Sequence, residues 1–241
     1  MKEAEEVFAA AKAKGVFIME AMWTRFFPLM KTIQKLLHEE QKLGTIYRTF
    51  CDFGLDIDLP SLPDSSRYKD PALGAGSLLD IGIYSLTWGL TTLSDNVGDE
   101  AEDPEVSSSQ TIAHGVDVAS QVLLSYRSTG RQGICTSTTN YPGHDDFARI
   151  EGSKGHIVVR GGAPSTPEGF VFYPKGGGKE EVYNFEKPGR GFFWEADAVA
   201  QDLKAGRKQN ETMPWAETLR TLRIMDGVRR RGGANFPVDE W

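Results

Sequence analysis

The stretch that decides the fold is Gly74-Ala-Gly-Ser-Leu-Leu-Asp-Ile-Gly-Ile-Tyr-Ser-Leu-Thr-Trp88, which reads as a loop that runs directly into a helix. Ser77 has the residue type of an N-cap, and Asp80 follows three positions later, where a carboxylate favours helix initiation. Apolar residues then recur at alternating spacings of four and three, which predicts one helix face turned toward a core. These residues are Leu79, Ile83, Leu86, Leu90 and Leu93.

Asp80 and Tyr84 lie outside this apolar stripe, and their spacing of four places them on one side of the helix. Gly82 lies between them and has no side chain, so a ligand or another backbone could approach closely. The pattern therefore predicts a small polar site with an access notch. The residues alone also fit a helix-start carboxylate beside a tyrosine at the edge of the core.

Three parts of the chain resemble one enzyme family. They are residues 74–84, the segment Glu20-Ala-Met-Trp-Thr-Arg-Phe-Phe-Pro28, and a C-terminal block that contains Gly189-Arg-Gly-Phe-Phe-Trp-Glu-Ala-Asp-Ala-Val-Ala200 and Met213-Pro-Trp-Ala-Glu-Thr-Leu219. The family is the glucose-fructose oxidoreductase/inositol dehydrogenase (Gfo/Idh/MocA) family of nicotinamide-dependent sugar and diol dehydrogenases. Within it, the likeness is to dimeric dihydrodiol dehydrogenases and NADP-dependent D-xylose dehydrogenases, and it extends over nearly the whole chain.

The resemblance implies roles for four residues. Tyr84 matches the residue that accepts the proton of the substrate hydroxyl, and Asp80 matches the one that orients the site or the substrate. Trp23 and Phe53 match aromatic residues beside the substrate pocket. For these two residues the alternative is that both are simply aromatic members of the core.

A phenol with a reference pKa of about 10 is a weak base at neutral pH unless a nearby cation lowers that pKa. In the family this cation is the lysine of a Glu-Lys-Pro sequence at the end of a strand in the nucleotide domain. Glu186-Lys187-Pro188 is present here, but it follows the predicted strands, whereas the family motif precedes a helix like residues 2–14. Lys187 is therefore not expected to act on Tyr84.

A dinucleotide site needs Gly-x-Gly-x-x-Gly between a strand and a helix. The glycine pairs at 74–76, 176–178 and 189–191 all fail that context. The full-length family member is therefore expected to use NADP or NAD, whereas this chain alone is expected neither to bind the cofactor nor to be active. The residues fit NAD as well as NADP, and a trans-dihydrodiol as well as D-xylose.

The N-terminal part reads as the end of a Rossmann domain. Residues 1–15 predict an amphipathic helix that stops at Gly15, and Val16–Met19 predicts a short strand that is buried on both faces. We therefore expect residues 1–22 to be the remnant of a dinucleotide-binding domain with its start missing. Residues 23–241 are expected to form the substrate and dimerisation domain.

The remaining pattern predicts an α+β fold, with an open, mainly antiparallel sheet and helices on one face. A helix over 28–40, a strand over 45–54 and a long loop over 55–76 precede the central helix. Seven strands joined by short turns follow, which is typical of an antiparallel meander: 106–112, 116–127, 132–140, 147–152, 156–160, 169–173 and 181–185. Two helices, from 193 to 205 and from 212 to 231, complete the chain.

The strand over 116–126 is partly apolar on both faces, which predicts a homodimer through the sheet face that carries no helices. A net charge of -7 argues against nucleic acid and anionic membranes as partners. No apolar run approaches the roughly 20 residues of a membrane span, and the acidic start does not fit a signal peptide.

Cysteines and histidines indicate neither a metal site nor disulfides. Cys51 and Cys135 lie in predicted strands, which favours buried free thiols and a cytoplasmic location. His114 and His144-Asp145-Asp146 lie in or beside predicted turns without a third ligand at a suitable spacing, so we expect exposed turn residues and no bound metal.

Two functions fit the sequence. The first is an NADP-dependent oxidoreductase that acts on a CH–OH group of a sugar or diol, of the D-xylose 1-dehydrogenase or trans-dihydrodiol dehydrogenase type, truncated and inactive as this chain. The alternative is a non-catalytic dimerising or sugar-binding protein derived from the substrate domain. A Gly-x-Gly-x-x-Gly and a Glu-Lys-Pro encoded in frame before Met1 would decide for the enzyme.

Overall fold

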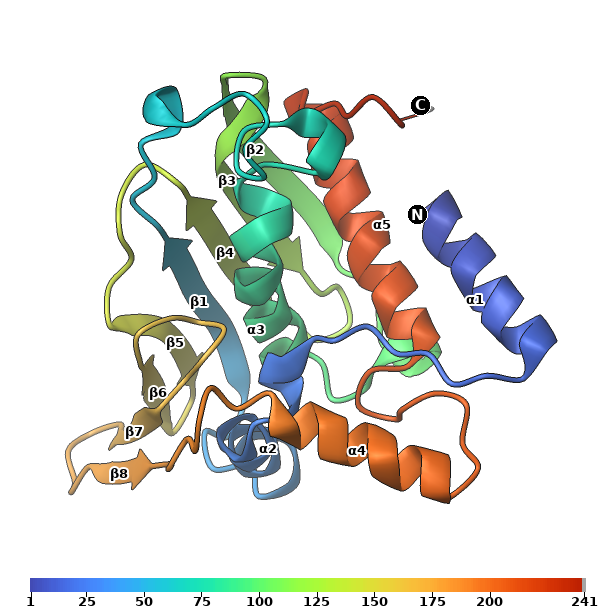
Figure 1. The fold of residues 1–241 in the computed structure, drawn as a ribbon. Helices are drawn as coiled ribbons and strands as arrows, with labels where there is room; N and C mark the ends of the chain where they lie inside the picture. The colour runs from blue at the N-terminus through green and yellow to red at the C-terminus, as the bar shows by residue number, and fades with distance from the viewer. Residues whose placement is uncertain (240–241) are drawn as a thin grey trace.

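The computed structural model describes residues 1–239, which form one open eight-stranded sheet with helices on one face (Figure 1). The strand order is β2-β3-β4-β1-β5-β6-β7-β8, and every neighbouring pair is antiparallel except β1 with β4. The strands are β1 (Ile46–Gly54), β2 (Glu105–Ala113), β3 (Val116–Ser125), β4 (Gln132–Thr138), β5 (Asp146–Gly152), β6 (Gly155–Arg160), β7 (Gly169–Pro174) and β8 (Glu181–Asn184). The predicted α+β fold with an open, mainly antiparallel sheet is confirmed.

The helices lie in front of the sheet in Figure 1, where α3 packs on β1 and β4, and α5 packs on β2. Helix α1 lies outside α5, and α4 runs below both. The helices are α1 (Lys2–Lys14), η1 (Trp23–Phe26), α2 (Pro28–Gln34), η2 (Lys35–Glu39), η3 (Leu59–Ser61), η4 (Pro71–Leu73), η5 (Leu78–Gly82), α3 (Ile83–Leu93), η6 (Gly98–Glu100), α4 (Phe193–Lys204) and α5 (Trp215–Gly232). Each predicted helix is present within a few residues of its expected bounds.

The position of β1 differs from the predicted meander. This strand is inserted between β4 and β5, parallel to the first and antiparallel to the second. The connection from β4 to β5 must therefore pass the end of β1, and Gly143 in it donates a backbone hydrogen bond to Gly54 O at 3.0 Å. Turn residues indicate only which strands follow one another in sequence, so they could not reveal this insertion.

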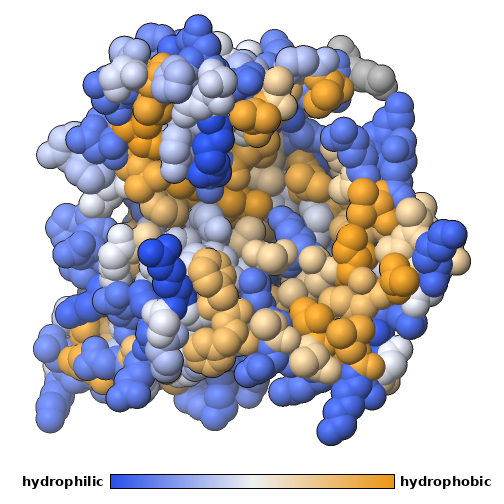
Figure 2. Space-filling model, viewed as in Figure 1, coloured by the Kyte–Doolittle hydropathy of each residue, from blue (hydrophilic) through white to orange (hydrophobic). Residues whose placement is uncertain are grey.

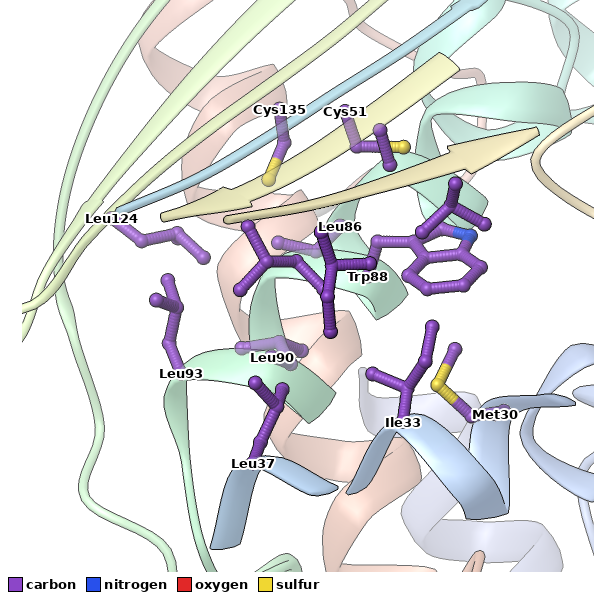
Figure 3. Packing of buried hydrophobic residues seen from close by; sticks show 14 of the residues in the cluster. Met30, Ile33, Leu37, Cys51, Leu86, Trp88, Leu90, Leu93, Leu124 and Cys135 are labelled. Carbon is purple, nitrogen blue, oxygen red and sulfur yellow. The ribbon is translucent and has the colours of Figure 1, made fainter. Parts of the chain in front are cut away.

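The core is centred on α3, which is buried on almost all sides. Side chains of the sheet lie on one side of it and side chains of α2 and η2 on the other (Figure 3). Leu86, Leu90 and Leu93 of the predicted stripe are fully buried, but so is Trp88 on another face. The prediction of one buried helix face was therefore incomplete, because α3 is packed between two layers and is buried on more than one face.

The N-terminal helix α1 is confirmed and ends at Gly15 in the left-handed conformation. The strand predicted for Val16–Met19 is wrong, since this segment pairs with no strand of the described residues and Val16 is 50% exposed. The segment is instead held by a side chain of α5, since Trp215 Nε1 donates a hydrogen bond of 2.9 Å to Ile18 O. An apolar run forms a strand only where a neighbouring backbone can pair with it. The expected domain boundary after residue 22 stays a prediction.

Apolar surface gathers on the helix side of the molecule, between α1, α4 and α5 (Figure 2). Val7 of α1 and Leu203 of α4 are among the exposed large apolar side chains. Surface of this kind is typical of contacts with further protein.

The opposite face of the sheet carries a row of paired residues that crosses seven strands. Thr49 on β1 bonds Thr92 of α3, so its neighbour Phe50 points away from the helices. Strand register aligns with Phe50 a row that is apolar except for one arginine: Leu123, Ile134, Phe50, Arg149, Val158, Val171 and Val182. Leu123 and Val182 near its two ends are 44% and 54% exposed. No helix of the described residues is long and apolar enough to cross a membrane.

Candidate active site

The helix that carries the candidate site starts differently from the prediction. Ser77 does not cap it, because its hydroxyl donates to Oδ2 of Asp117 on β3 at 2.8 Å. The same carboxylate oxygen accepts a hydrogen bond of 2.8 Å from the backbone N–H of Leu78, and Asp117 is only 1% exposed. A buried aspartate from the sheet therefore caps the helix start. This fixes the position of Asp80 and Tyr84 relative to the sheet.

Gly82 does not form the predicted access notch. It is buried against β4, where a Cβ atom would lie 2.8 Å from Ser137 Oγ. The glycine therefore allows η5 to approach the sheet closely. The close approach expected at Gly82 is therefore made by a side chain of β4.

Three of the four predicted site residues, Trp23, Phe53 and Tyr84, lie together. Trp23 of η1 donates from Nε1 to Tyr84 Oη at 3.1 Å. The Phe53 ring at the end of β1 lies 5.9 Å from the Tyr84 ring, centroid to centroid. Phe53 is buried and Trp23 packs against the main core, so their predicted roles as pocket walls and as core aromatics are compatible.

Asp80, the fourth residue, lies one turn before Tyr84 and is engaged by a loop residue that the sequence pattern did not reveal. Arg67 Nη2 donates to Asp80 Oδ1 at 2.5 Å, and its guanidinium lies over the ring of Tyr68. Arg67 belongs to the long loop 55–76, which was expected to shape the substrate side. No periodic signal connects position 67 with position 80, because Arg67 lies in a turn between the short helices η3 (Leu59–Ser61) and η4 (Pro71–Leu73).

Aromatic residues before and within α4 complete the surroundings of Trp23. Phe192 stacks on the Trp23 ring at 4.1 Å and is 53% exposed, and Trp194 packs on Phe27 at 4.7 Å. A Cβ atom on Gly191 would lie 2.6 Å from the Phe27 ring, so this glycine permits the aromatic packing. The sequence predictions did not name these residues as part of the site. The only sign of their role was that they lie in the Gly189–Ala200 block that resembles the family.

The electrostatic surroundings keep Tyr84 protonated. Burial raises the pKa of Tyr84, the hydrogen bond from Trp23 lowers it, and the negative charges of Asp80, Glu195 and Glu20 raise it further. No cation of the described residues is among these groups. Lys187 instead forms an ion pair of 2.9 Å with Glu168, in agreement with the expectation that it does not act on Tyr84.

The described residues do not fit a nicotinamide dinucleotide. The glycines at 176–178 lie in the turn between β7 and β8, and those at 74–76 precede η5. The pair at 189–191 precedes α4 but continues to Trp194, which fills the position of the third glycine with an indole. None of these segments offers the turn that lets a pyrophosphate approach a helix N-terminus.

Cys51 and Cys135 are buried free thiols, as predicted, and lie opposite each other on β1 and β4. His114 lies in the turn between β2 and β3 and His144 in the loop between β4 and β5, and both are exposed, as predicted. Among residues 1–239, no group of three or more histidine, cysteine or acidic side chains is placed to hold a metal ion.

Comparison with known proteins gives consistent results. The GFO/IDH/MocA C-terminal domain model matches residues 30–158. The chain is 31% identical to D-xylose 1-dehydrogenase (NADP(+)) of Hypocrea jecorina, over 98% of this chain and 64% of that protein. It is 32% identical to trans-1,2-dihydrobenzene-1,2-diol dehydrogenase of Mus musculus, over 99% of this chain and 68% of that protein.

Solved structures share the fold. The aldose-aldose oxidoreductase from Caulobacter crescentus superimposes with a TM-score of 0.76 at 23% identity, over 95% of this chain and 65% of that chain. The chain thus spans roughly two thirds of the length of the proteins that it matches. On the matched domain and on identities above 30% with full-length enzymes, this chain belongs to the Gfo/Idh/MocA family.

Proposed function

We propose that this protein is an oxidoreductase that uses NADP and acts on a CH–OH group of a sugar or diol, of the D-xylose 1-dehydrogenase or trans-dihydrodiol dehydrogenase type. The observation that carries the proposal is the grouping of three residues around Tyr84: Trp23 donates to its hydroxyl, the Phe53 ring lies 5.9 Å from its ring, and the charge of Asp80 raises its pKa. Relatives with these two activities support the substrate class. No observation favours the alternative of a non-catalytic sugar-binding protein.

Tyr84 is the proposed acceptor of the proton that leaves the substrate hydroxyl. Its raised pKa makes it a weak base in the surroundings that the described residues provide, so the proposal requires a cation beside it. The family resemblance assigns that cation to a lysine of a nucleotide domain. Trp23 holds the phenol oxygen, Asp80 orients the site, and Phe53 with Phe192 forms apolar walls.

A bound nicotinamide dinucleotide supplies the hydride acceptor in such a reaction. The described residues contain no turn for its pyrophosphate, so we assign no cofactor contact to them. As part of the same proposal, the 241-residue chain alone neither binds the cofactor nor turns over substrate.

The proposed assembly is a two-fold dimer through the helix-free face of the sheet. The row from Leu123 to Val182 carries apolar side chains on six of its seven strands, and a self-complementary contact between two such faces would bury those that are exposed, such as Leu123 and Val182. A cytoplasmic location fits the two buried free thiols.

Replacing Tyr84 by phenylalanine tests the proposed function in a form of the protein that carries its nucleotide domain. The change removes only the hydroxyl, so turnover of D-xylose or a trans-dihydrodiol, followed by NADPH absorbance, should fall by about 10²–10⁴-fold. Tyr141→Phe is the matched control, because Tyr141 is 73% exposed. Near-normal turnover in Tyr84→Phe would exclude the tyrosine as proton acceptor.

A further inference from the structure

Three carboxylates of the described residues raise the pKa of Tyr84, and Glu195 is the one without a nearby positive charge. Asp80 is paired with Arg67. Glu20 lies near the positive charge of Arg25, although its Oε2 atom, like that of Glu195, is buried without a hydrogen-bond partner among the described residues. Burial raises the pKa of Glu195, and no group in the described part of the chain lowers it.

The Oε2 atom of Glu195 is buried and has no hydrogen-bond partner within residues 1–239. A buried carboxylate oxygen without a donor costs free energy, so such an atom is a good acceptor for a ligand that brings a donor. Glu195 is in the first turn of α4, three residues after Phe192. Residues three apart share a side of a helix, and Phe192 stacks on Trp23 beside Tyr84. Glu195 therefore borders the same site.

We propose that Glu195 is a specificity-determining residue whose carboxylate accepts a hydrogen bond from a substrate hydroxyl other than the one oxidised, and whose charge excludes sugars with a phosphate or carboxylate at that end. The inference rests on the proposed function, because it places the substrate at Tyr84. Glu20 lies close enough to Tyr84 to affect its pKa and adds a second negative charge. An anionic sugar would meet both charges, whereas a neutral polyol would supply the missing donor.

The test measures binding to the 241-residue chain by ligand-detected NMR, so it does not depend on turnover. The neutral probes are D-xylose and trans-1,2-dihydrobenzene-1,2-diol, and the anionic probe is D-xylose 5-phosphate. Glu195→Ala should weaken binding of a neutral probe about tenfold or more, since a hydrogen bond to a charged group is lost. Glu195→Gln keeps an acceptor oxygen, so it should bind the neutral probe within about threefold of the unmodified protein. Glu195→Gln should also bind D-xylose 5-phosphate about tenfold more tightly than the unmodified protein does, because the negative charge that repels the phosphate is removed.

Asp197→Asn is the control, because Asp197 is exposed on the same helix and should change neither affinity. A merely structural role of Glu195 would weaken all probes alike in both variants, and this result would overturn the proposal. Absence of neutral-probe binding by the unmodified chain would overturn it too. If the affinities follow the expected pattern but Tyr84→Phe keeps full activity, the proposed role of Glu195 in ligand binding stands. The proposed role of Tyr84 as proton acceptor is then refuted.

Discussion

Replacing Asp117 by alanine should lower the free energy of unfolding by about 3–5 kcal/mol. The buried carboxylate accepts three hydrogen bonds of 2.8 Å, from Ser77 Oγ, Leu78 N and Ser120 Oγ, and alanine would leave all three donors without this partner. We assign about 1–1.5 kcal/mol to each bond, in line with a lost helix cap and with buried donors left unsatisfied.

Urea unfolding followed by circular dichroism measures this effect. The control is Asp70→Ala, since Asp70 accepts one bond of 2.9 Å from Ala72 N at an exposed turn, and its loss should cost no more than about 1 kcal/mol. Asp117→Asn keeps one acceptor oxygen and should lie between the two. Equal unfolding free energies for Asp117→Ala and Asp70→Ala would refute the reasoning that the sheet anchors the start of the central helix.

Three further outcomes are expected. Light scattering at micromolar concentration should show a dimer, and a monomer without any substitution would contradict the proposed interface. Ile134→Glu places a charge on the helix-free face and should give a folded monomer. The control Val16→Glu changes an exposed residue away from that face and should stay dimeric. Calorimetry should detect no NADP(H) binding to the 241-residue chain, and micromolar affinity would mean that a cofactor site has been overlooked. Burial raises the pKa of Glu217, but the charges of Arg25 and Arg220 outweigh it and lower the pKa below the ordinary 4.5. Because the folded pKa is the lower one, the stability that Glu217 contributes is present above pH 4.5 and is lost as the pH falls further, so urea midpoints should decline more steeply there than in Glu217→Gln.

The seven strands from β2 to β8 and all long helices could be predicted from sequence because their signals are local. Glycine turns, period-two alternation and helical stripes depend on residues a few positions apart. The position of β1 depends on pairing with β4, more than 70 residues later, and no local pattern encodes that contact. The strand predicted for Val16–Met19 was wrong for the same reason, since apolar residues form a buried strand only where a partner strand exists.

For the candidate site, the identities of Trp23, Phe53, Asp80 and Tyr84 came from the family resemblance, and their proximity came from the fold. Arg67 was not predicted, because an irregular loop places it. The cap by Asp117 was missed because Ser77 offered a local alternative. Such tertiary contacts override local propensity wherever a buried charge can satisfy several donors at once.

The contact between Trp23 and Tyr84 is held from both sides, which bears on how the site can work. On one side, Asp117 ties the start of the helix to the sheet. On the other, Arg25 in the same short helix as Trp23 donates to Glu217 of α5 at 2.6 Å, and both members of this ion pair are almost completely buried. Breaking either anchor would leave a buried charge without its partner, so both elements resist displacement. The phenol oxygen of Tyr84 is therefore positioned before any ligand arrives. The binding of a substrate beside it is not opposed by the entropy cost of ordering this side chain.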